Sequence, residues 1–185
     1  MPRTHILSPG YGSGKVASTV SLIEAEGALI VVDPGMVSSR AAILDPLAAL
    51  GYDPSEVTDV IISHHHPDHT INVALFPEAV LHDHWATYRN DEWNSRPAEG
   101  VVVAPGVTLW ETPGHTPQDI TTIVETEEGV TVFTHLWTSE NYPPEDRLAT
   151  DPEALHRSRA RVLEIAEIVV PGHGPAFRVS EETPR

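Results

Sequence analysis

The sequence predicts an α/β (or α+β) fold of layered sheets with helices on their outer faces. Two observations support this prediction: short β-branched runs recur along most of the chain, and helical patterns occupy only two segments, at about 39–50 and 151–166. The strands therefore come in two groups, each accompanied by a helix, which is the pattern of layered sheets. The chain has 185 residues, of which 40% are hydrophobic, so a single domain over residues 1–185 is expected.

The first group of elements contains three strands and one helix. Apolar, β-branched runs at 18–24 and 28–32 are separated by Ala-Glu-Gly, which predicts a β-hairpin. A serine would then cap a helix over about 39–50, although Pro46 would kink or split it. A further β-branched run predicts a short strand at 57–62.

The second group begins with a short strand at 79–81. Residues 82–85 are expected to open a helical or irregular segment, and 97–105 to be mostly loop. Thr150 or Asp151 can cap a final helix, which has a proline in its first turn and continues to about residue 166. The remaining strands are expected at 107–111, 120–126, 130–134 and 168–170.

Charge and composition limit the partners of the chain. Asp and Glu number 27 against 11 Lys and Arg, giving a net charge of −16. This charge repels polyanions, so nucleic acid and anionic membranes are disfavoured as partners. The chain has no cysteine, no apolar run long enough to cross a membrane and no visible signal peptide, so we expect a cytoplasmic location. A homodimer would be the commonest oligomer.

The segment 63–70 concentrates potential metal ligands. It reads Ser-His-His-His-Pro-Asp-His-Thr, so that His64, His66, Asp68 and His69 form the pattern His-x-His-x-Asp-His. Buried imidazoles and carboxylates each need a partner, and a metal ion supplies one; this mixture suits zinc or iron(II). The sequence therefore predicts a metal site at the end of a strand, against the alternative of a surface histidine cluster or a tag-like accident.

Three further histidines follow predicted strands. His115 lies in Thr-Pro-Gly-His-Thr and His173 in Pro-Gly-His-Gly, where the neighbouring glycines let the backbone turn tightly and bring an imidazole near a metal. His135 directly follows the strand predicted at 130–134. One rim of a layered fold would collect all of these side chains. His65, between two potential ligands, is expected to point away from the metal.

The glycine-rich segment 10–15 resembles a phosphate-binding loop only in part. It reads Gly-Tyr-Gly-Ser-Gly-Lys, but Pro9 stands where that motif begins with glycine, and Val16 replaces the serine or threonine after the lysine. We therefore expect a flexible loop at the rim of a pocket. Lys15 is the only lysine of the chain.

The histidine motifs, in their order and approximate spacing, resemble those of the metallo-β-lactamase superfamily. Asp33, which ends a strand in Val-Val-Asp-Pro-Gly, belongs to the same pattern. The resemblance covers roughly residues 18–178, and the segment from Asp151 onward resembles the small, single-domain members. It implies a four-layer αββα sandwich with the metal site on one edge.

The resemblance also implies roles for individual residues. Asp33 would orient the histidine loop, as metal ligands generally require. Related hydrolases usually have a bridging aspartate at the position of His135. A neutral imidazole cannot bridge two metals, so His135 would be a terminal ligand or line the pocket, and the site would hold one metal or two. The first metal would be held by His64, His66 and His115, and the second by Asp68, His69 and His173.

The implied activity is metal-dependent hydrolysis of a small-molecule substrate. Zinc is the favoured cofactor, as one or two ions, with iron or manganese as alternatives. A metal-bound hydroxide would attack a carbonyl or phosphoryl centre, while Asp68 orients the nucleophile or shuttles its proton. A small ester, thioester or lactone is favoured, and Trp137 and His84 are candidates to line the substrate pocket.

Three other functions remain open on the sequence. The first is phosphodiester cleavage in single-stranded RNA, which the net charge disfavours. The second is a non-catalytic metal- or ligand-binding module on a hydrolase scaffold, which applies if His135 prevents formation of a dinuclear site. Iron-dependent oxygen or NO chemistry is the least favoured, because it would call for a flavin-binding partner domain.

Overall fold

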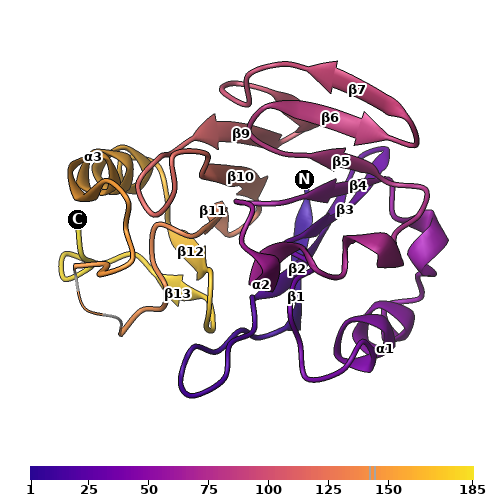
Figure 1. Ribbon diagram of the computed structural model, residues 1–185, viewed down its shortest axis with the longest axis horizontal. Helices are drawn as coiled ribbons and strands as arrows, with labels where there is room; N and C mark the ends of the chain where they lie inside the picture. Colours follow the sequence, from indigo (N-terminus) through magenta and orange to yellow (C-terminus); the bar gives the residue numbers. More distant parts are fainter. Residues whose placement is uncertain (142, 144) are drawn as a thin grey trace.

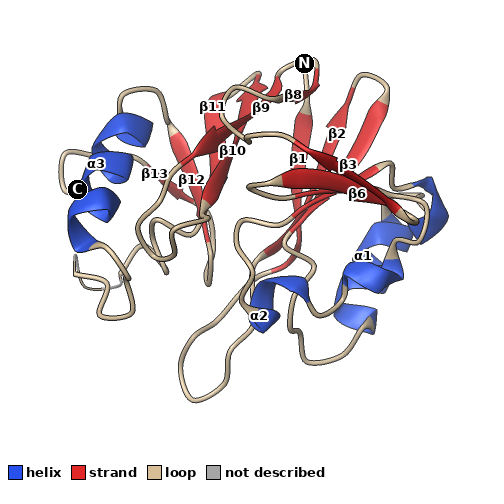
Figure 2. Ribbon diagram, turned by 45° about the horizontal axis from the view of Figure 1, so that its top comes forward, coloured by secondary structure: helices blue, strands red, loops and turns tan. Residues whose placement is uncertain are grey.

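Two β-sheets face each other in the computed structural model, which describes residues 1–141, 143 and 145–185. Helix α1 (Ala41–Ala49) covers the outer face of the first sheet, and α3 (Pro152–Leu163) covers that of the second (Figure 1, Figure 2). This αββα arrangement confirms the four-layer fold class. Over the described residues, none of the helices has the length and apolarity required to cross a membrane.

The first sheet is formed by the N-terminal half of the chain. Its strands follow one another in sequence order from β1 to β7. β3, β4 and β5 are parallel to one another, and all other neighbours are antiparallel. The strands are β1 (Arg3–Ser8), β2 (Val20–Ala25), β3 (Ala28–Val32), β4 (Asp59–Ile61), β5 (Val80–His82), β6 (Ala86–Arg89) and β7 (Glu92–Ser95).

The second sheet is formed by the C-terminal half, in the order β13-β12-β11-β10-β9-β8. Only β11 and β12 pair in parallel, because α3 connects them. The strands are β8 (Val102–Ala104), β9 (Val107–Glu111), β10 (Ile120–Thr126), β11 (Gly129–Thr134), β12 (Ile168–Pro171) and β13 (Phe177–Arg178).

The helices differ in how they begin. Asp151 caps α3 by accepting a hydrogen bond from the backbone N–H of Ala154 at 2.9 Å, as expected. α1 begins after Arg40 without a side-chain cap, so the expected serine cap is wrong, and Pro46 lies inside the helix. The short helices are α2 (Pro67–Thr70), η1 (Pro54–Glu56) and η2 (Val73–Leu75).

Three apolar layers hold the sandwich together. Successive strand residues point to opposite faces, so Ile23 and Ile30 enter the layer between the sheets, whereas Leu22 and Val31 pack toward α1. The third layer lies between the second sheet and α3. An apolar layer thus lies on each face of both sheets, and the loops that carry the histidines lie at one edge of the sandwich.

Residues 83–85 are irregular, which is one of the two forms expected for the segment 82–85, but they lead into the β6–β7 hairpin, which was not expected. Two other segments differ from their predictions. Arg3–Ser8 forms an edge strand where none was expected, and Val102–Ala104 forms β8 within a predicted loop. All of these strands are short or lie at or near a sheet edge, where many side chains are exposed and no apolar alternation is required.

Candidate metal centre

Loops and helix starts from both sheets bring seven potential ligands to one edge of the sandwich. The segment after β4 and helix α2 carry the first four, and the loops after β9, β11 and β12 carry one histidine each. The structure thus brings together every residue that the sequence nominated as a ligand: His64, His66, Asp68, His69, His115, His135 and His173.

The first group consists of His64, His66 and His115. His66 Nδ1 lies 2.9 Å from His64 Nε2 and 3.2 Å from His115 Nε2. His66 is exposed, whereas the other two are buried, so the group opens toward solvent on one side. These are the three side chains expected to hold the first metal.

The second group consists of Asp68, His69 and His173. The Nε2 atoms of the two histidines are 3.4 Å apart. Asp68 Oδ2 lies 3.4 Å from His173 Nε2 and 3.7 Å from His69 Nε2. These are the three side chains expected to hold the second metal.

Hydrogen bonds on the far side of each ring fix which nitrogen faces the site. His173 Nδ1 donates to the carbonyl of Ala17 at 2.8 Å, and His115 Nδ1 donates to Asp146 Oδ2 at 2.9 Å. His69 Nδ1 donates to Asp33 Oδ2 at 2.8 Å. Because these partners only accept, the neutral form of each ring carries its hydrogen on Nδ1 and presents a bare Nε2 to the site.

His64 is oriented through a relay that starts at the same carboxylate. The Ser63 hydroxyl donates to Asp33 Oδ2 at 2.7 Å, so its oxygen accepts from His64 Nδ1 at 3.0 Å. Asp33 Oδ1 also accepts from the Ser63 backbone N–H at 2.6 Å. Asp33 therefore organises the histidine loop, as the sequence predicted, and does so at a positive φ of 50°.

This arrangement of lone pairs fits a metal cation. His69 Nε2, His173 Nε2 and Asp68 Oδ2 all accept, and no hydrogen lies between them. In the first group, His66 Nδ1 can donate to one neighbour at most. Lone pairs held this close repel one another unless a cation lies among them, and neutral imidazole with carboxylate suits zinc.

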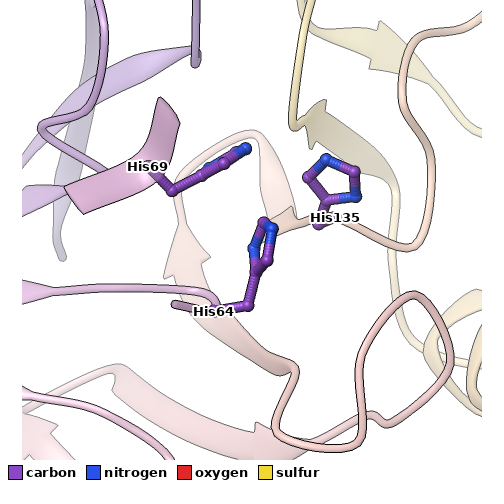
Figure 3. Close-up of side chains that lie close together, drawn as sticks. All are labelled: His64, His69 and His135. Carbon is purple, nitrogen blue, oxygen red and sulfur yellow. The ribbon is translucent and has the colours of Figure 1, made fainter. Parts of the chain in front are cut away.

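His135 lies between the two groups. Its ring stacks on His115 with centroids 4.1 Å apart and lies 4.7–5.1 Å from the rings of His64, His69 and His173. Figure 3 shows the side chains of His64, His69 and His135 converging from the segment after β4, from helix α2 and from the segment after β11. Among the described residues, His135 Nδ1 has no hydrogen-bond partner although it is buried. The position of the ring allows it to join either group.

Burial favours the neutral form of four of the imidazoles, those of His64, His66, His135 and His173. Desolvation, followed by the neighbouring histidines, lowers the pKa of His64 and of His135 far below the usual range. Desolvation also lowers the pKa of His66 and His173. Neutral imidazole is the form that binds a metal, so these four rings can coordinate at neutral pH.

Two glycines allow the ligand loops to approach each other. A side chain at Gly172 would overlap the His135 ring, leaving its Nε2 only 2.9 Å away. A side chain at Gly35 would overlap the Asp68 carbonyl. Gly172, the glycine before His173, thus leaves room for the neighbouring imidazole of His135 in addition to letting the chain turn.

Neither of the two residues expected to line the substrate pocket belongs to the ligand groups. Trp137 is 2% exposed and packs in the apolar layer under α3, where its indole N–H donates to the Pro184 carbonyl at 2.9 Å. It is a core residue, so its expected place in the pocket is corrected. His84 is half-buried beside Trp85 and belongs to neither ligand group.

Several supporting residues carried no signal in the sequence. Asp146, the partner of His115, lies 31 positions further along the chain. Asp119 holds the turn after His115 by accepting from the backbone N–H of Thr116 at 2.8 Å, and burial raises its pKa to about 6. His65 points away from the cluster, as expected, with its Nε2 3.1 Å from Asp83.

The fold and the ligand groups define a metallo-hydrolase, and comparison with known proteins gives its class. A family model described as "Metallo-beta-lactamase superfamily" matches residues 13–176. The chain belongs to this superfamily, and its solved structural neighbours include metal-dependent hydrolases.

Individual relatives agree with this assignment. The chain is 38% identical over 189 residues to metallo-β-lactamase domain-containing protein 1 of Mus musculus, covering 96% of this chain and 70% of that protein. It is 27% identical over 187 residues to an N-acyl homoserine lactonase of Bacillus thuringiensis, covering 79% and 75%. A metallo-β-lactamase-type structure from Thermotoga maritima superimposes with a TM-score of 0.74 at 19% identity, covering 96% and 99%. The similarity to the first relative confirms the resemblance expected from the histidine motifs and from the segment after Asp151.

Proposed function

We propose that this hydrolase uses zinc to cleave small acyl compounds, namely esters, thioesters or lactones. The observation that carries the proposal is the convergence of two ligand groups whose bare nitrogens and carboxylate oxygen face one another. A related lactonase supports a cyclic or open ester as the substrate class. We also propose that the protein acts in the cytoplasm and without nucleic acid.

The chain's own residues would contribute orientation and proton transfer. Zinc bound to neutral imidazoles supplies a water of lowered pKa and polarises a carbonyl group. Asp68 is the only acid in the two groups, and its side chain is 19% exposed, so it can both contact a ligand and exchange a proton with solvent. Asp33 and Asp146 hold the imidazoles in the tautomers that bind metal.

His66 and Asp68 mark the open side of the centre. Both lie at the start of α2 and are less buried than the histidines behind them. A substrate would therefore approach from this side, with His115, His135 and His173 forming the closed wall. This geometry suits a small substrate whose reacting carbonyl can reach the exposed edge.

A substrate panel with zinc-loaded protein tests the proposal. The panel contains a thioester, a lactone, an aryl ester and single-stranded RNA, each assayed with and without a chelator. We expect chelator-sensitive turnover of one or more acyl compounds. Turnover of RNA alone would replace the proposal with phosphodiester hydrolysis, and no turnover by metal-loaded protein would favour a binding module.

Elemental analysis after dialysis against zinc tests the cofactor. We expect one tightly bound zinc and a second, weaker one, because His135 cannot bridge. Preferential retention of iron or manganese from a mixture of the three metals would contradict the choice of zinc.

A further inference from the structure

Strand β7 forms one edge of the first sheet. The sheet runs in order from β1 to β7, and β7 is the outermost strand at the top of the molecule (Figure 1). Every residue of the strand, Glu92–Ser95, is exposed. An edge strand presents unpaired backbone N–H and C=O groups, which can pair with a strand of another chain.

The pairing with β6 shows which backbone groups of β7 are free. The backbone N–H of Arg96 donates to the carbonyl of Trp85 at 2.8 Å, and this bond continues the regular register of β6 and β7. Hydrogen-bonded positions alternate along an antiparallel strand. Asn94, two residues before Arg96, therefore also bonds to β6, whereas the backbone groups of Trp93 and Ser95 point to the open edge.

The other sheet edges are less suited to pairing. β1 and β8 each contain a shift in register, and β13 has only two residues. Irregularities of this kind protect an edge strand from pairing with another chain. β7 is regular, and its side chain Trp93 is 65% exposed, so this edge combines free backbone groups with an uncovered aromatic ring.

The charges at the two ends of β7 are complementary to each other. Glu92 begins the strand and Arg96 follows it, and neither forms an ion pair with any described residue. The Arg96 guanidinium donates from Nη1 to the carbonyl of Asp83 at 2.7 Å, which leaves its charge without a carboxylate partner. Two antiparallel copies of β7 would bring the acidic end of each against the basic end of the other, as a two-fold interface requires.

We propose that two copies of the chain form a dimer by antiparallel pairing of their β7 strands. The two-fold axis passes beside Asn94, so that Trp93 of each copy exchanges backbone hydrogen bonds with Ser95 of the other. This register uses every free group of the edge. Pairing Trp93 with itself would place Ser95 against the hairpin turn, and pairing Ser95 with itself would bring in Pro97, which has no N–H.

The same register covers the exposed side chains of the strand. Glu92 lies opposite Arg96 of the other copy on one face of the joined sheet. On the other face Trp93, which packs against Tyr88 with ring centroids 4.7 Å apart, gains the Trp93 of the other copy as a diagonal neighbour. The inference is independent of the proposed function, because β7 carries none of the seven potential metal ligands.

Sedimentation equilibrium of zinc-loaded protein over a range of concentrations tests the dimer. We expect the mass to rise with concentration toward twice the 20.2 kDa of one chain. Ser95→Pro should raise the dissociation constant about tenfold or more, because proline removes an N–H that faces only the second copy. Ser95→Ala keeps this N–H and should dimerise like the wild type. The mass of a single chain at every concentration would overturn the proposal.

A charge reversal tests the side-chain pairing. Glu92→Arg places a cation opposite Arg96 of the other copy, so it should raise the dissociation constant about fivefold or more. Glu181→Arg makes the same change of net charge on an exposed residue after β13. It should not weaken the dimer, because it reduces the repulsion between two chains of net charge −16. Equal weakening by both variants would contradict the proposed register.

Disulfide cross-linking tests the register directly, and it remains decisive if Ser95→Pro does not fold. The chain has no cysteine, so one introduced cysteine reports only on its own counterpart. The two Asn94 residues face each other at a non-hydrogen-bonded position, where Cα atoms lie about 4.5 Å apart and a disulfide can form. The two Glu92 residues are offset by four positions, or about 13 Å. We expect Asn94→Cys to form a covalent dimer under mild oxidation about tenfold faster than Glu92→Cys, and equal rates would overturn the β7 pairing.

Discussion

At the scale of single residues, one carboxylate sets the tautomers of two ligands. Asp33 accepts directly from His69 and, through the Ser63 hydroxyl, orients His64. We expect Asp33→Asn to weaken zinc binding about 10- to 100-fold, because the amide donates where a carboxylate accepted. A competition titration with a zinc-binding dye measures this change. Asp45→Asn, which removes an exposed acid on α1, should leave the affinity unchanged.

His135 offers a second test at this scale. Its ring lies between the two ligand groups but has one lone pair to share. We expect His135→Asp to bind two zinc ions with similar affinity, because a carboxylate can bridge them, whereas the wild type binds the second ion more weakly. Elemental analysis across a range of zinc concentrations measures both sites. A variant that holds no more zinc than His135→Gln would contradict the bridging argument.

The ligands themselves could be predicted from sequence, but their supports could not. The ligands follow strand ends in short motifs, so local pattern identifies them. Asp146 lies in a separate loop and meets His115 only in the folded chain. Trp137 was misplaced for the same reason, because closeness to His135 in sequence does not reveal that the next residues turn into the core.

At the scale of elements, strands with a buried, β-branched pattern could be predicted and edge strands could not. β10 matches its predicted bounds, and α3 begins at its expected cap. β7 is exposed along its length and is held in the sheet by its hydrogen bonds to β6. A local signal was present in the turn between them, where Asn90 adopts a positive φ of 53°, as hairpin turns require.

The turn after β12 makes a prediction about the metal centre. Gly172→Ala would push against the His135 ring, while the nearest side-chain atom to a new Cβ at Gly174 is 3.2 Å away, in Ser139. We expect Gly172→Ala to reduce zinc affinity and activity by about tenfold or more, since a misplaced supporting group costs this much. Gly174→Ala should have a smaller effect on both. Zinc titration and circular dichroism together distinguish a local change from misfolding.

The β5–β6 connection makes a prediction about acid stability. Burial alone would raise the pKa of Asp83, but hydrogen bonds from His65, Tyr88, Ala86 and Trp85 outweigh it and lower the pKa to about 2. A lowered pKa means that this carboxylate stabilises the folded state above its ordinary pKa of 3.8, and that the contribution disappears as the pH falls toward 2.

Asp83→Asn tests this dependence. We expect the variant to be less stable than the wild type by about 1–3 kcal/mol at neutral pH, because buried donors lose their acceptor. The difference should narrow between about pH 4 and pH 2. Urea unfolding at a series of pH values measures it, with Asp91→Asn in the exposed hairpin turn as the control. A difference that stays constant down to pH 2 would contradict the argument.

At the scale of the whole molecule, the metal centre joins the two sheets. The first sheet's loops supply four potential ligands and the second sheet's loops supply three. We expect saturating zinc, at about 100 times its Kd, to stabilise the fold by about 3 kcal/mol, or a Tm rise of about 5–10 °C, relative to chelator-treated protein. Differential scanning calorimetry measures the shift. His64→Ala should reduce the shift, and an equal shift in that variant would place the zinc elsewhere.

Each sheet is built from one continuous half of the chain, since β7 ends at Ser95 and β8 begins at Val102. A ribosome therefore completes the first sheet before any of the second has been made. The inner apolar face of the first sheet stays exposed until the second sheet packs against it. The first ligand group is complete in the nascent chain once His115 has emerged, whereas Asp68 and His69 must wait for His173, which follows β12. The two groups therefore become available to metal at different stages of synthesis.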